Sequence, residues 1–287
     1  MSAARAHRGV VAGEYVMTAE DFAFIAGVMR ESAGIHLGSG KATLAYSRLA
    51  KRLRALGLEN FKDYCALVGA PEGSEELQAM VAALTTNVTR FFREPHHFEA
   101  LAAEFETRLA EKARAGQPVR LWSAACSTGQ EPYSMAMTVL DALPEALDLD
   151  VRILGTDIDP NVLAEARAGI YAAEVAAAIP PEARRRHGMA TGDRGSFAVS
   201  RQLRDLVVFN SLNLNGAWPM KRRFDVIFCR NVAIYFDDAT QERLWGRLAD
   251  ALVPGGLLCI GHSERVSGPA EARFHLGGLT TYRRSAT

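Results

Sequence analysis

From residue 119 onward, short apolar segments alternate with segments of helical periodicity, and this alternation limits the possible folds more than any other feature. The expected strands and helices are, in chain order, strand 119–124, helix 132–143, strand 151–155, helix 160–168, strand 224–229, helix 238–252 and strand 257–261. Such alternation is typical of an α/β fold with a doubly wound, mostly parallel sheet and right-handed crossovers. A hairpin over 274–283 predicts one antiparallel edge strand.

The chain before residue 119 has a helical pattern, because apolar residues recur at helical spacing and no β-rich run occurs there. Thr18 followed by Asp21 indicates a helix N-terminus, and Gly57 suits the end of a helix over 42–56. The expected divisions are an extension 1–17, a small all-α domain 18–90, a connector 91–118, and an α/β domain 119–287 that contains a small inserted β-subdomain 172–208 with strands over 196–200 and 206–209.

Charge and cysteine usage exclude several classes of protein. Lys and Arg total 33 and Asp and Glu total 33, so the formal net charge is zero, which disfavours a nucleic-acid partner. The four cysteines lie far apart without a C-x-x-C pair, which predicts reduced thiols, no zinc site and a cytoplasmic protein. The apolar runs are shorter than the roughly 18 residues that a membrane span needs, so we expect no membrane insertion.

One local segment is strongly basic despite the neutral total. No acidic residue occurs from Ser32 to Leu58. Leu49, Leu53 and Leu56 are expected on the core side of the 42–56 helix. A solvated face is the ordinary interpretation of such a run, but solvated faces usually mix both signs. We therefore predict a docking face for an acidic partner, made by Lys41, Arg48, Lys51, Arg52 and Arg54.

The residues that follow the predicted strands indicate the ligand, because open α/β sheets bind ligands beyond the carboxyl ends of their strands. The first loop holds a single glycine, Gly129, and then Glu131 at the helix start. An acid there would repel a pyrophosphate, whereas Asp157 after the second strand suits ribose hydroxyls. A nucleoside with a cationic, phosphate-free substituent is S-adenosylmethionine. The alternatives are an N-cap role for Asp157, although Asp159 is the better cap, and a helix-dipole role for Glu131.

Four motifs, in order, resemble the chemotaxis receptor methyltransferases of the CheR family, and the resemblance covers about residues 18–284. The motifs are Asn87-Val88-Thr89-Arg90-Phe91-Phe92-Arg93-Glu94 with His96-His97-Phe98, the segment from Trp122 to Ser134, Thr156-Asp157-Ile158-Asp159, and the segment from Phe228 to Phe236.

The resemblance implies a Rossmann-like methyltransferase domain that moves a methyl group from S-adenosylmethionine to glutamate γ-carboxylates on chemoreceptor signalling helices, leaving S-adenosylhomocysteine. It implies catalytic roles for Arg93 and Tyr235. It places cofactor contacts on Asn87, Thr89, Arg93, Glu131, Asp157, Asn213, Leu214, Arg230 and Asn231. In some relatives the inserted subdomain binds a receptor C-terminal tail, and recruitment to receptor arrays is a further implication.

The sequence departs from the family pattern at two positions near the catalytic residues. Gln130 replaces an acid that often precedes Glu131, and Ala233 replaces a larger apolar residue, so we expect looser packing around Tyr235. A glutamate is already ionised at pH 7, so attack needs no general base. We expect Arg93 to orient the reactants and neutral Tyr235 to donate a hydrogen bond; the alternative for Arg93 is an ion pair with Glu94 or Glu99.

The histidines and the competing functions complete the expectations. His262 is expected to be a loop or capping residue, and His96 and His97 are expected to begin a helix through packing and capping. The competing functions are a methyltransferase for another carboxylate, a module that senses S-adenosylmethionine without catalysis, and, more distantly, a dehydrogenase. The last lacks its glycine fingerprint.

Overall fold

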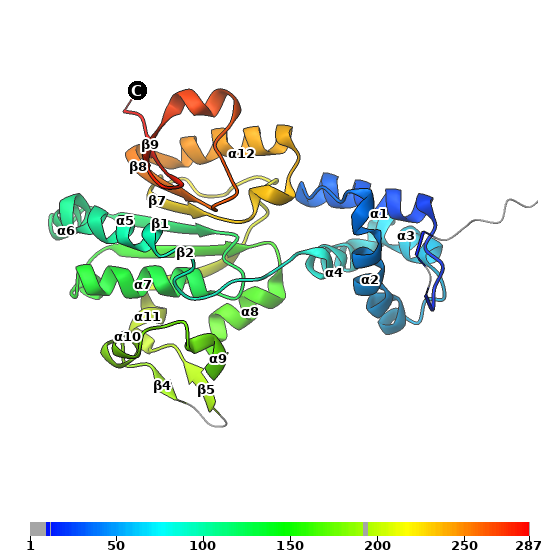
Figure 1. Cartoon of the computed structure of the whole chain (residues 1–287), viewed down its shortest axis with the longest axis horizontal. Helices are drawn as coiled ribbons and strands as arrows, with labels where there is room; N and C mark the ends of the chain where they lie inside the picture. The colour runs from blue at the N-terminus through cyan, green and yellow to red at the C-terminus, as the bar shows by residue number, and fades with distance from the viewer. Residues whose placement is uncertain (1–9, 12, 192–194, 287) are drawn as a thin grey trace, which may run out of the picture. The chain divides into compact units, whose positions relative to one another are not determined.

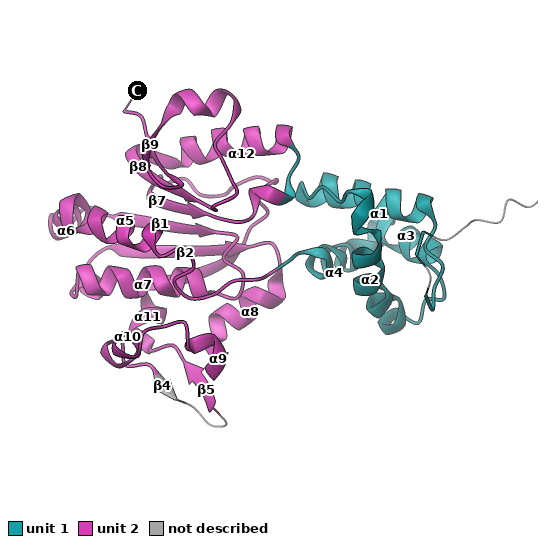
Figure 2. Ribbon diagram, in the orientation of Figure 1, with its two compact units in different colours: residues 1–86, 235–237 teal, residues 87–234, 238–287 magenta. Residues whose placement is uncertain are grey.

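The structure is a computed structural model that describes residues 10–11, 13–191 and 195–286. Its contacts divide the chain into two compact units (Figure 2). The first, called the helical unit here, comprises residues 1–86 together with Tyr235–Asp237. The second, called the sheet unit, comprises Asn87–Ile234 and Asp238–Thr287.

The helical unit consists of short helices whose ends follow from local sequence. They are α1 (Ala19–Ala33), η1 (Ser39–Lys41), α2 (Ala42–Leu56), α3 (Phe61–Gly69), η2 (Pro71–Gly73) and α4 (Ser74–Leu84) (Figure 1). Thr18 and Asp21 form the expected capping box, in which each side chain accepts from the other residue's backbone N–H. Gly57 ends α2 with φ 68°, a left-handed conformation that glycine adopts without strain.

The core of the helical unit confirms part of the predicted amphipathic pattern. Leu49 and Leu53 of α2 are fully buried, as are Phe61 and Tyr64 of α3. Leu56, predicted to face the core, is exposed instead, because it lies in the last turn of α2 just before Gly57. The packing of α2 against the core therefore ends one turn earlier than its periodicity suggests.

Residues 13–17, expected as part of a loose extension, pack against the rest of the helical unit. Met17 is fully buried. The backbone N–H of Tyr15 donates to the hydroxyl of Tyr46 at 3.0 Å, and its ring meets Phe61 edge-on. Residues 1–9 and 12 of the predicted extension lie outside the described residues.

The sheet unit contains a seven-stranded sheet in the order β6-β2-β1-β7-β8-β10-β9. The strands are β1 (Val119–Ala124), β2 (Val151–Asp157), β6 (Val207–Ser211), β7 (Phe224–Cys229), β8 (Leu252–Ile260), β9 (Phe274–Gly278) and β10 (Thr281–Arg284). The β6, β2, β1, β7 and β8 strands run parallel to one another, which confirms the predicted doubly wound sheet.

Helices connect and cover these strands (Figure 1). They are α5 (His96–Glu104), the π-helix η3 (Phe105–Leu109), α6 (Ala110–Arg114), α7 (Gln130–Ala142), η4 (Ala146–Asp148), α8 (Pro160–Ala168), α11 (Arg201–Leu206), η6 (Ala233–Tyr235), α12 (Asp238–Ala251) and η7 (Gly268–Arg273). One buried cluster includes alternate residues of the central strands, such as Leu121, Ile153 and Val226, together with Phe98 of α5 and Tyr133 of α7. No helix in the described part of the chain is long and apolar enough to cross a membrane.

The structure corrects the sheet at three points. The segment predicted as a strand of the insert, 206–209, is β6 of the main sheet, where Val207 pairs with Ile153 of β2. The hairpin contributes two antiparallel strands, because β10 pairs with β8 and β9 pairs with β10. The β8 strand begins at Leu252 and passes through Pro254, which was expected to separate it from the helix.

The inserted segment forms a separate small sheet in the order β3-β5-β4. Its strands are β3 (Ile170–Ala172), β4 (Ala190–Thr191) and β5 (Ser196–Ala198), and α9 (Ala173–Ala176) and α10 (Pro181–Arg186) lie between β3 and β4. The pairs are antiparallel. Of the two strands predicted for this insert, only the one over 196–200 belongs to it.

Candidate functional site

The carboxyl ends of the three central parallel strands lie level with one another. In the sheet register, Ala124 at the end of β1 pairs with Thr156 of β2 and with Cys229 of β7. The loops that follow these strands therefore start side by side. This is the edge where doubly wound sheets bind their ligands.

The loop after β1 has an unusual backbone that brings its N–H groups toward β2. Ala125 and Ser127 have φ values of 59° and 51°, and Gly129 has a φ of 93°. A side chain at Gly129 would meet the Cβ of Ala166 at 2.8 Å, so only glycine fits. Strained non-glycine residues of this kind concentrate at functional sites, where the surrounding contacts hold them.

The carboxylate of Asp157 accepts hydrogen bonds from that loop and from the residue that caps α8. Its Oδ2 accepts from the backbone N–H of Ser127 at 2.8 Å, and its Oδ1 accepts from the N–H of Asp159 at 3.0 Å. Burial raises the pKa of Asp157, and these two N–H groups oppose the rise. The N-cap of α8 is Asp159, whose carboxylate accepts from the N–H of Asn161, so the capping alternative for Asp157 is wrong.

A buried arginine links the loops after β1 and β7. Arg230, which follows β7, donates from Nη1 to Glu131 Oε2 at 2.9 Å, and the Oγ of Ser123 donates to Glu131 Oε1 at 2.7 Å. Arg230 also donates from Nη2 to the backbone carbonyl of Arg93. The Nε of Arg230 is buried without a hydrogen-bond partner among the described residues. Glu131 therefore does more than face the helix dipole of α7.

Glu94 is the second carboxylate beside Arg230. Its Oε2 lies 3.2 Å from Arg230 Nη2, and its Oε1 lies 3.1 Å from Nδ1 of His262. Burial acts to raise the pKa of Glu94, but Arg230 and His262 outweigh it and hold the pKa at about 2. His262 thus lies in a loop as predicted, and its partner is Glu94.

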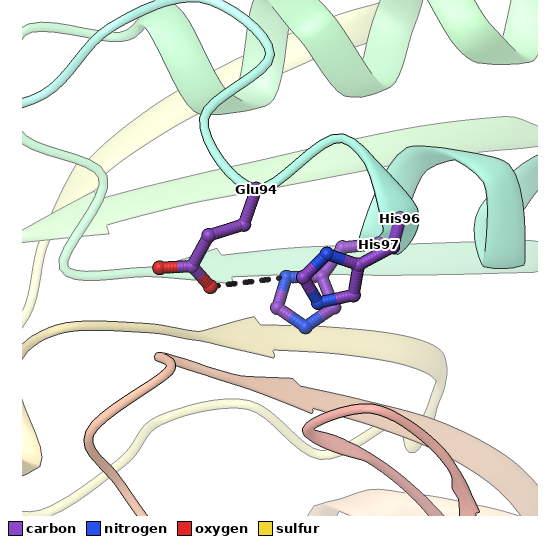
Figure 3. Close-up of side chains that lie close together, drawn as sticks. All are labelled: Glu94, His96 and His97. Atoms are coloured by element: carbon purple, nitrogen blue, oxygen red, sulfur yellow. Dashed lines mark ion pairs between the residues drawn. The ribbon is translucent and has the colours of Figure 1, made fainter.

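Glu94, His96 and His97 bring three potential ligand atoms within 4.8 Å of one another (Figure 3). Nδ1 of His97 lies 3.6 Å from Glu94 Oε2, and both atoms are buried without a hydrogen bond in the described chain. That oxygen already neighbours the full positive charge of Arg230, so a metal ion would be opposed there. The cluster is better explained as the surroundings of the Arg230 ion pair.

The two histidines begin α5, as expected. Nε2 of His96 and Nε2 of His97 lie 3.2 and 2.9 Å from the hydroxyl of Thr280. Burial and, to a smaller extent, the charge of Arg230 lower the pKa of His97 to about 3, so this imidazole is neutral at physiological pH. The expected packing role is confirmed, although neither ring caps the helix.

The segment before α5 approaches the same strand ends. The amide of Asn87 donates to Asp159 Oδ2 at 3.0 Å, and the hydroxyl of Ser127 donates to the carbonyl of Asn87 at 3.0 Å. Arg93 donates from Nη1 to the carbonyl of Val88 at 3.0 Å, while its Nε lies 4.0 Å from Glu94. The ion pair proposed as the alternative for Arg93 is thus a distant one. Thr89 is half-buried in this segment.

The loop after β6 carries the remaining predicted cofactor contacts. Asn213 accepts the N–H of Asn215 on its side-chain oxygen at 2.9 Å, and Leu214 is buried. Arg247 of α12 donates to the carbonyl of Leu214 at 2.6 Å and to that of Gly216. Its guanidinium lies 3.9 Å from the ring centroid of Trp218. Arg247 therefore fastens this loop to α12, and sequence reasoning missed it because arginines on an amphipathic helix usually face solvent.

The two candidate catalytic residues belong to different units. Arg93 is part of the sheet unit, whereas Tyr235 is grouped with the helical unit, where its carbonyl accepts the N–H of His36 at 2.7 Å. Asn231 has a φ of 58° in the loop that leads toward Tyr235, and Ala233 is fully buried.

The predicted docking face contains arginines with partners inside the helical unit. Arg48 donates to the carbonyls of Ala83 in α4 and of Thr85 just after it, and Arg52 forms two hydrogen bonds with the buried carboxylate of Glu76. Arg54 pairs with Glu14 at 3.0 Å. Lys41 and Lys51 are exposed. The segment itself contains no acidic residue, but the fold brings Glu76 and Glu14 from other parts of the chain to its arginines.

Like Arg247, Glu94 and Glu264 are site residues whose roles sequence reasoning missed. Glu94 was named only within a motif and as an alternative ion-pair partner of Arg93, and Glu264 was not singled out. Glu264 accepts from the backbone N–H groups of the loop after β7. Its signal was an acid three residues after Gly261, at the end of the last parallel strand.

Comparisons with known proteins find relatives over most of the chain. Residues 20–85 match the family described as "CheR methyltransferase, all-alpha domain", and residues 87–283 match "CheR methyltransferase, SAM binding domain". A "Probable chemotaxis protein methyltransferase" of Rhizobium etli is 51% identical over 253 residues, covering 88% of this chain and 94% of that protein.

Two enterobacterial proteins named "Chemotaxis protein methyltransferase" give similar results. The protein of Salmonella typhimurium is 43% identical over 264 residues, which cover 91% of this chain and 88% of that protein. The protein of Escherichia coli is also 43% identical over 264 residues, covering 91% of this chain and 89% of that protein.

Proposed function

The chain belongs to the CheR methyltransferase family, and from that premise we propose that it methylates glutamate γ-carboxylates of chemoreceptors with S-adenosylmethionine. The products are glutamyl methyl esters and S-adenosylhomocysteine. The observation that carries the proposal is the Arg230 ion-pair network at the strand ends, with Glu131 on one side and Glu94 on the other. It belongs to the segment that matches the SAM-binding family.

The residues of this edge fit S-adenosylmethionine by their donor set. Asp157 uses each carboxylate oxygen for one backbone N–H, which leaves lone pairs for ribose hydroxyls. Glu131 offers a carboxylate for the ammonium of an amino-acid moiety. Arg230 offers a guanidinium Nε, which no described residue hydrogen-bonds, for the carboxylate of that moiety. Asn87, Thr89, Arg93, Asn213, Leu214 and Asn231 are the further contacts that we assign to the cofactor.

The chemistry needs orientation and dryness more than it needs a base. When bound, S-adenosylmethionine supplies a methyl group on a sulfonium cation, which a carboxylate attacks directly. Charge disappears as the reactants combine, so exclusion of water favours the reaction. The burial of Arg230, Asp157 and Ser127 indicates such a dry edge. No residue of this edge has to remove a proton, because the substrate glutamate is ionised at neutral pH.

Arg93 and Tyr235 are the catalytic residues in this proposal. Arg93 orients a carboxylate through its guanidinium, and Tyr235 donates a hydrogen bond from its hydroxyl. We expect Arg93→Ala and Tyr235→Phe to lower kcat for receptor methylation at least tenfold. Arg90→Ala changes an exposed arginine of the same segment and is the matched control. Near-normal methyl transfer by both folded variants would exclude this assignment.

The receptor helices dock, in this proposal, on the basic face of α2. Because Arg48 and Arg52 hold the helical unit together, the lysines of the face provide the cleaner test. Lys41→Glu and Lys51→Glu should each raise KM for receptor and weaken its salt dependence, with unchanged cofactor affinity. Lys62→Glu, at an exposed position of α3, is the control. An unchanged KM in both variants would remove the docking face.

The small sheet provides a second surface for a receptor. Each of its outer strands, β3 and β4, pairs with the central β5, so a peptide strand can add at an outer edge. We propose that a receptor C-terminal tail binds there. Calorimetry with the tail peptide tests this, and absence of heat at millimolar peptide would exclude it.

The decisive experiment for the function uses labelled cofactor and purified receptor signalling domains. Base-labile label on receptor glutamates is the expected result. Binding of the cofactor without transfer would favour the sensing module instead. Transfer to small carboxylic acids but not to receptors would favour a methyltransferase of other specificity.

A further inference from the structure

In the loop after β7, the backbone N–H groups from Asn231 to Ile234 donate to one carboxylate, that of Glu264. Oε1 of Glu264 accepts from the N–H groups of Val232 and Ala233 at 2.9 and 2.8 Å and, more distantly, from that of Ile234 at 3.4 Å. Oε2 accepts from the N–H of Asn231 at 2.9 Å. Four consecutive backbone N–H groups thus converge on one side chain, which is the geometry of an anion-binding nest.

Glu264 comes from a tight turn that follows β8. Its own N–H donates to the carbonyl of Gly261 at 2.9 Å, and the N–H of Gly261 donates to its Oε2. A side chain at Gly261 would lie 2.4 Å from the side-chain Nδ2 of Asn231 and 2.8 Å from both the backbone nitrogen of Asn231 and Oε2 of Glu264. The close approach of this turn to the β7 loop therefore requires glycine.

The carboxylate is buried and balanced by dipoles. Glu264 is 8% exposed, and no lysine, arginine or histidine in the described chain forms an ion pair with it. Burial raises the pKa of Glu264, and the surrounding N–H groups oppose that rise. The positive φ of Asn231 takes this loop out of regular secondary structure, so its backbone N–H groups need another acceptor. The carboxylate of Glu264 is that acceptor.

The same turn also reaches the segment before α5. His262, two residues before Glu264, contacts Oε1 of Glu94, the residue that follows Arg93. One turn after β8 therefore holds both segments that carry the assigned site residues. These segments are the loop that presents Arg230 and Asn231 and the stretch that presents Arg93.

We propose that Glu264 is a positioning residue of the methyl-transfer site, whose carboxylate fixes the loop from Asn231 to Ile234. This inference rests on the proposed function. The loop leads directly into Tyr235, so a looser loop displaces the hydroxyl that we assign to catalysis. Such a displacement lowers kcat even when the cofactor is still bound.

Replacement by glutamine separates charge from shape. Both carboxylate oxygens act only as acceptors of backbone N–H groups, so neither amide orientation satisfies the nest. The amide NH₂ then faces either Asn231 and Gly261 or Val232 and Ala233, donor against donor. Glu264→Ala instead empties the nest and leaves room for a small anion. Glu271→Gln, at an exposed position in η7, is the control for an unrelated glutamate.

The experiment compares these variants in the receptor methylation assay and in calorimetry with S-adenosylhomocysteine. We expect Glu264→Gln to lower kcat at least tenfold with cofactor affinity within threefold of the wild type. We expect 50 mM formate to restore Glu264→Ala at least threefold and to leave Glu264→Gln unchanged. Folded Glu264→Gln with kcat within twofold of the wild type overturns the inference, as does the absence of formate rescue in folded Glu264→Ala.

A measurement on the unmodified protein covers the case in which the variants do not fold. Hydrogen exchange should show slow exchange for the loop amides from Asn231 to Ile234, because each donates to a buried carboxylate. Fast exchange of these amides overturns the inference. A wild-type protein that methylates no receptor contradicts the proposed function, and its amide exchange still decides the role of Glu264 in the fold.

Discussion

The pairing of Arg52 with Glu76 yields a stability prediction that separates structural arginines from docking ones. Arg52 makes two hydrogen bonds to Glu76, and the hydroxyl of Tyr64 donates a third at 2.8 Å. The side chain of Glu76 is 7% exposed and that of Arg52 is 33% exposed. Arg52→Ala therefore leaves a buried carboxylate with a single neutral donor.

The magnitude follows from this burial. Breaking a buried ion pair from one side costs about 3–5 kcal/mol, and the partial exposure of Arg52 lowers the expected cost to about 2–3 kcal/mol. Arg54→Ala is the matched control, because Arg54 and Glu14 are 57% and 54% exposed. An exposed pair of this kind contributes about 0–1 kcal/mol.

Native-state hydrogen exchange is the suitable assay, since the three tryptophans, Trp122, Trp218 and Trp245, lie in the sheet unit and do not report on α2. Arg52→Ala should lower the opening free energy of α2 and α4 by the amount given, with Arg54→Ala near the wild type. A double change of Arg52→Met with Glu76→Met removes both charges and should cost less than Arg52→Ala. Equal effects of Arg52→Ala and Arg54→Ala would refute the reasoning.

Three further predictions concern the sheet unit. Folding lowers the pKa of His97 from 6.5 to about 3 and that of Glu94 from 4.5 to about 2. The unfolded chain therefore binds more protons than the folded chain, and the free energy of unfolding decreases as the pH falls below 6.5. His97→Asn should remove a slope of up to about 1.4 kcal/mol per pH unit between pH 6.5 and 4.5 in urea unfolding, and an unchanged slope would contradict this. Arg247→Ala frees the loop that contains Leu214, so it should weaken S-adenosylhomocysteine binding about tenfold, or about 1.4 kcal/mol, in calorimetry, with kcat within twofold of the wild type. Unaltered affinity would show that this loop keeps its conformation without Arg247. Asp157→Asn should weaken the same binding by about 1.5–3 kcal/mol, the value of a hydrogen bond to a charged group, and equal affinity would remove Asp157 from the cofactor site.

Local sequence was sufficient wherever the determining interaction is short in range. The capping box of Thr18 and Asp21 and the glycine end of α2 involve residues within one turn. The β7 strand, from Phe224 to Cys229, matched its prediction because its residues, apolar except for Asp225, are buried along its whole length. The cysteines are free as predicted, with Cys126, Cys229 and Cys259 buried.

Predictions from single segments were wrong where partners come from distant parts of the chain. The segment over 206–209 has strand character, but only its pairing with β2 decides that it joins the main sheet. The arginines of α2 look unpaired in sequence, yet Glu76 and Glu14 reach them from other elements. Periodicity describes which face is apolar and carries no information about which charge approaches the polar face.

The sequence by itself determined the family, the order of strands and helices and the residue types at the strand ends, because these follow from local propensity and from motifs read along the chain. Tertiary structure alone decided which charges meet. Arg230 lies between Glu94 and Glu131, and Glu264 accepts hydrogen bonds from the loop after β7. Each of these pairs is 30 or more residues apart along the chain. Electrostatic and hydrogen-bond energies depend on distance in space and on burial, and both arise only when the strands align in one sheet.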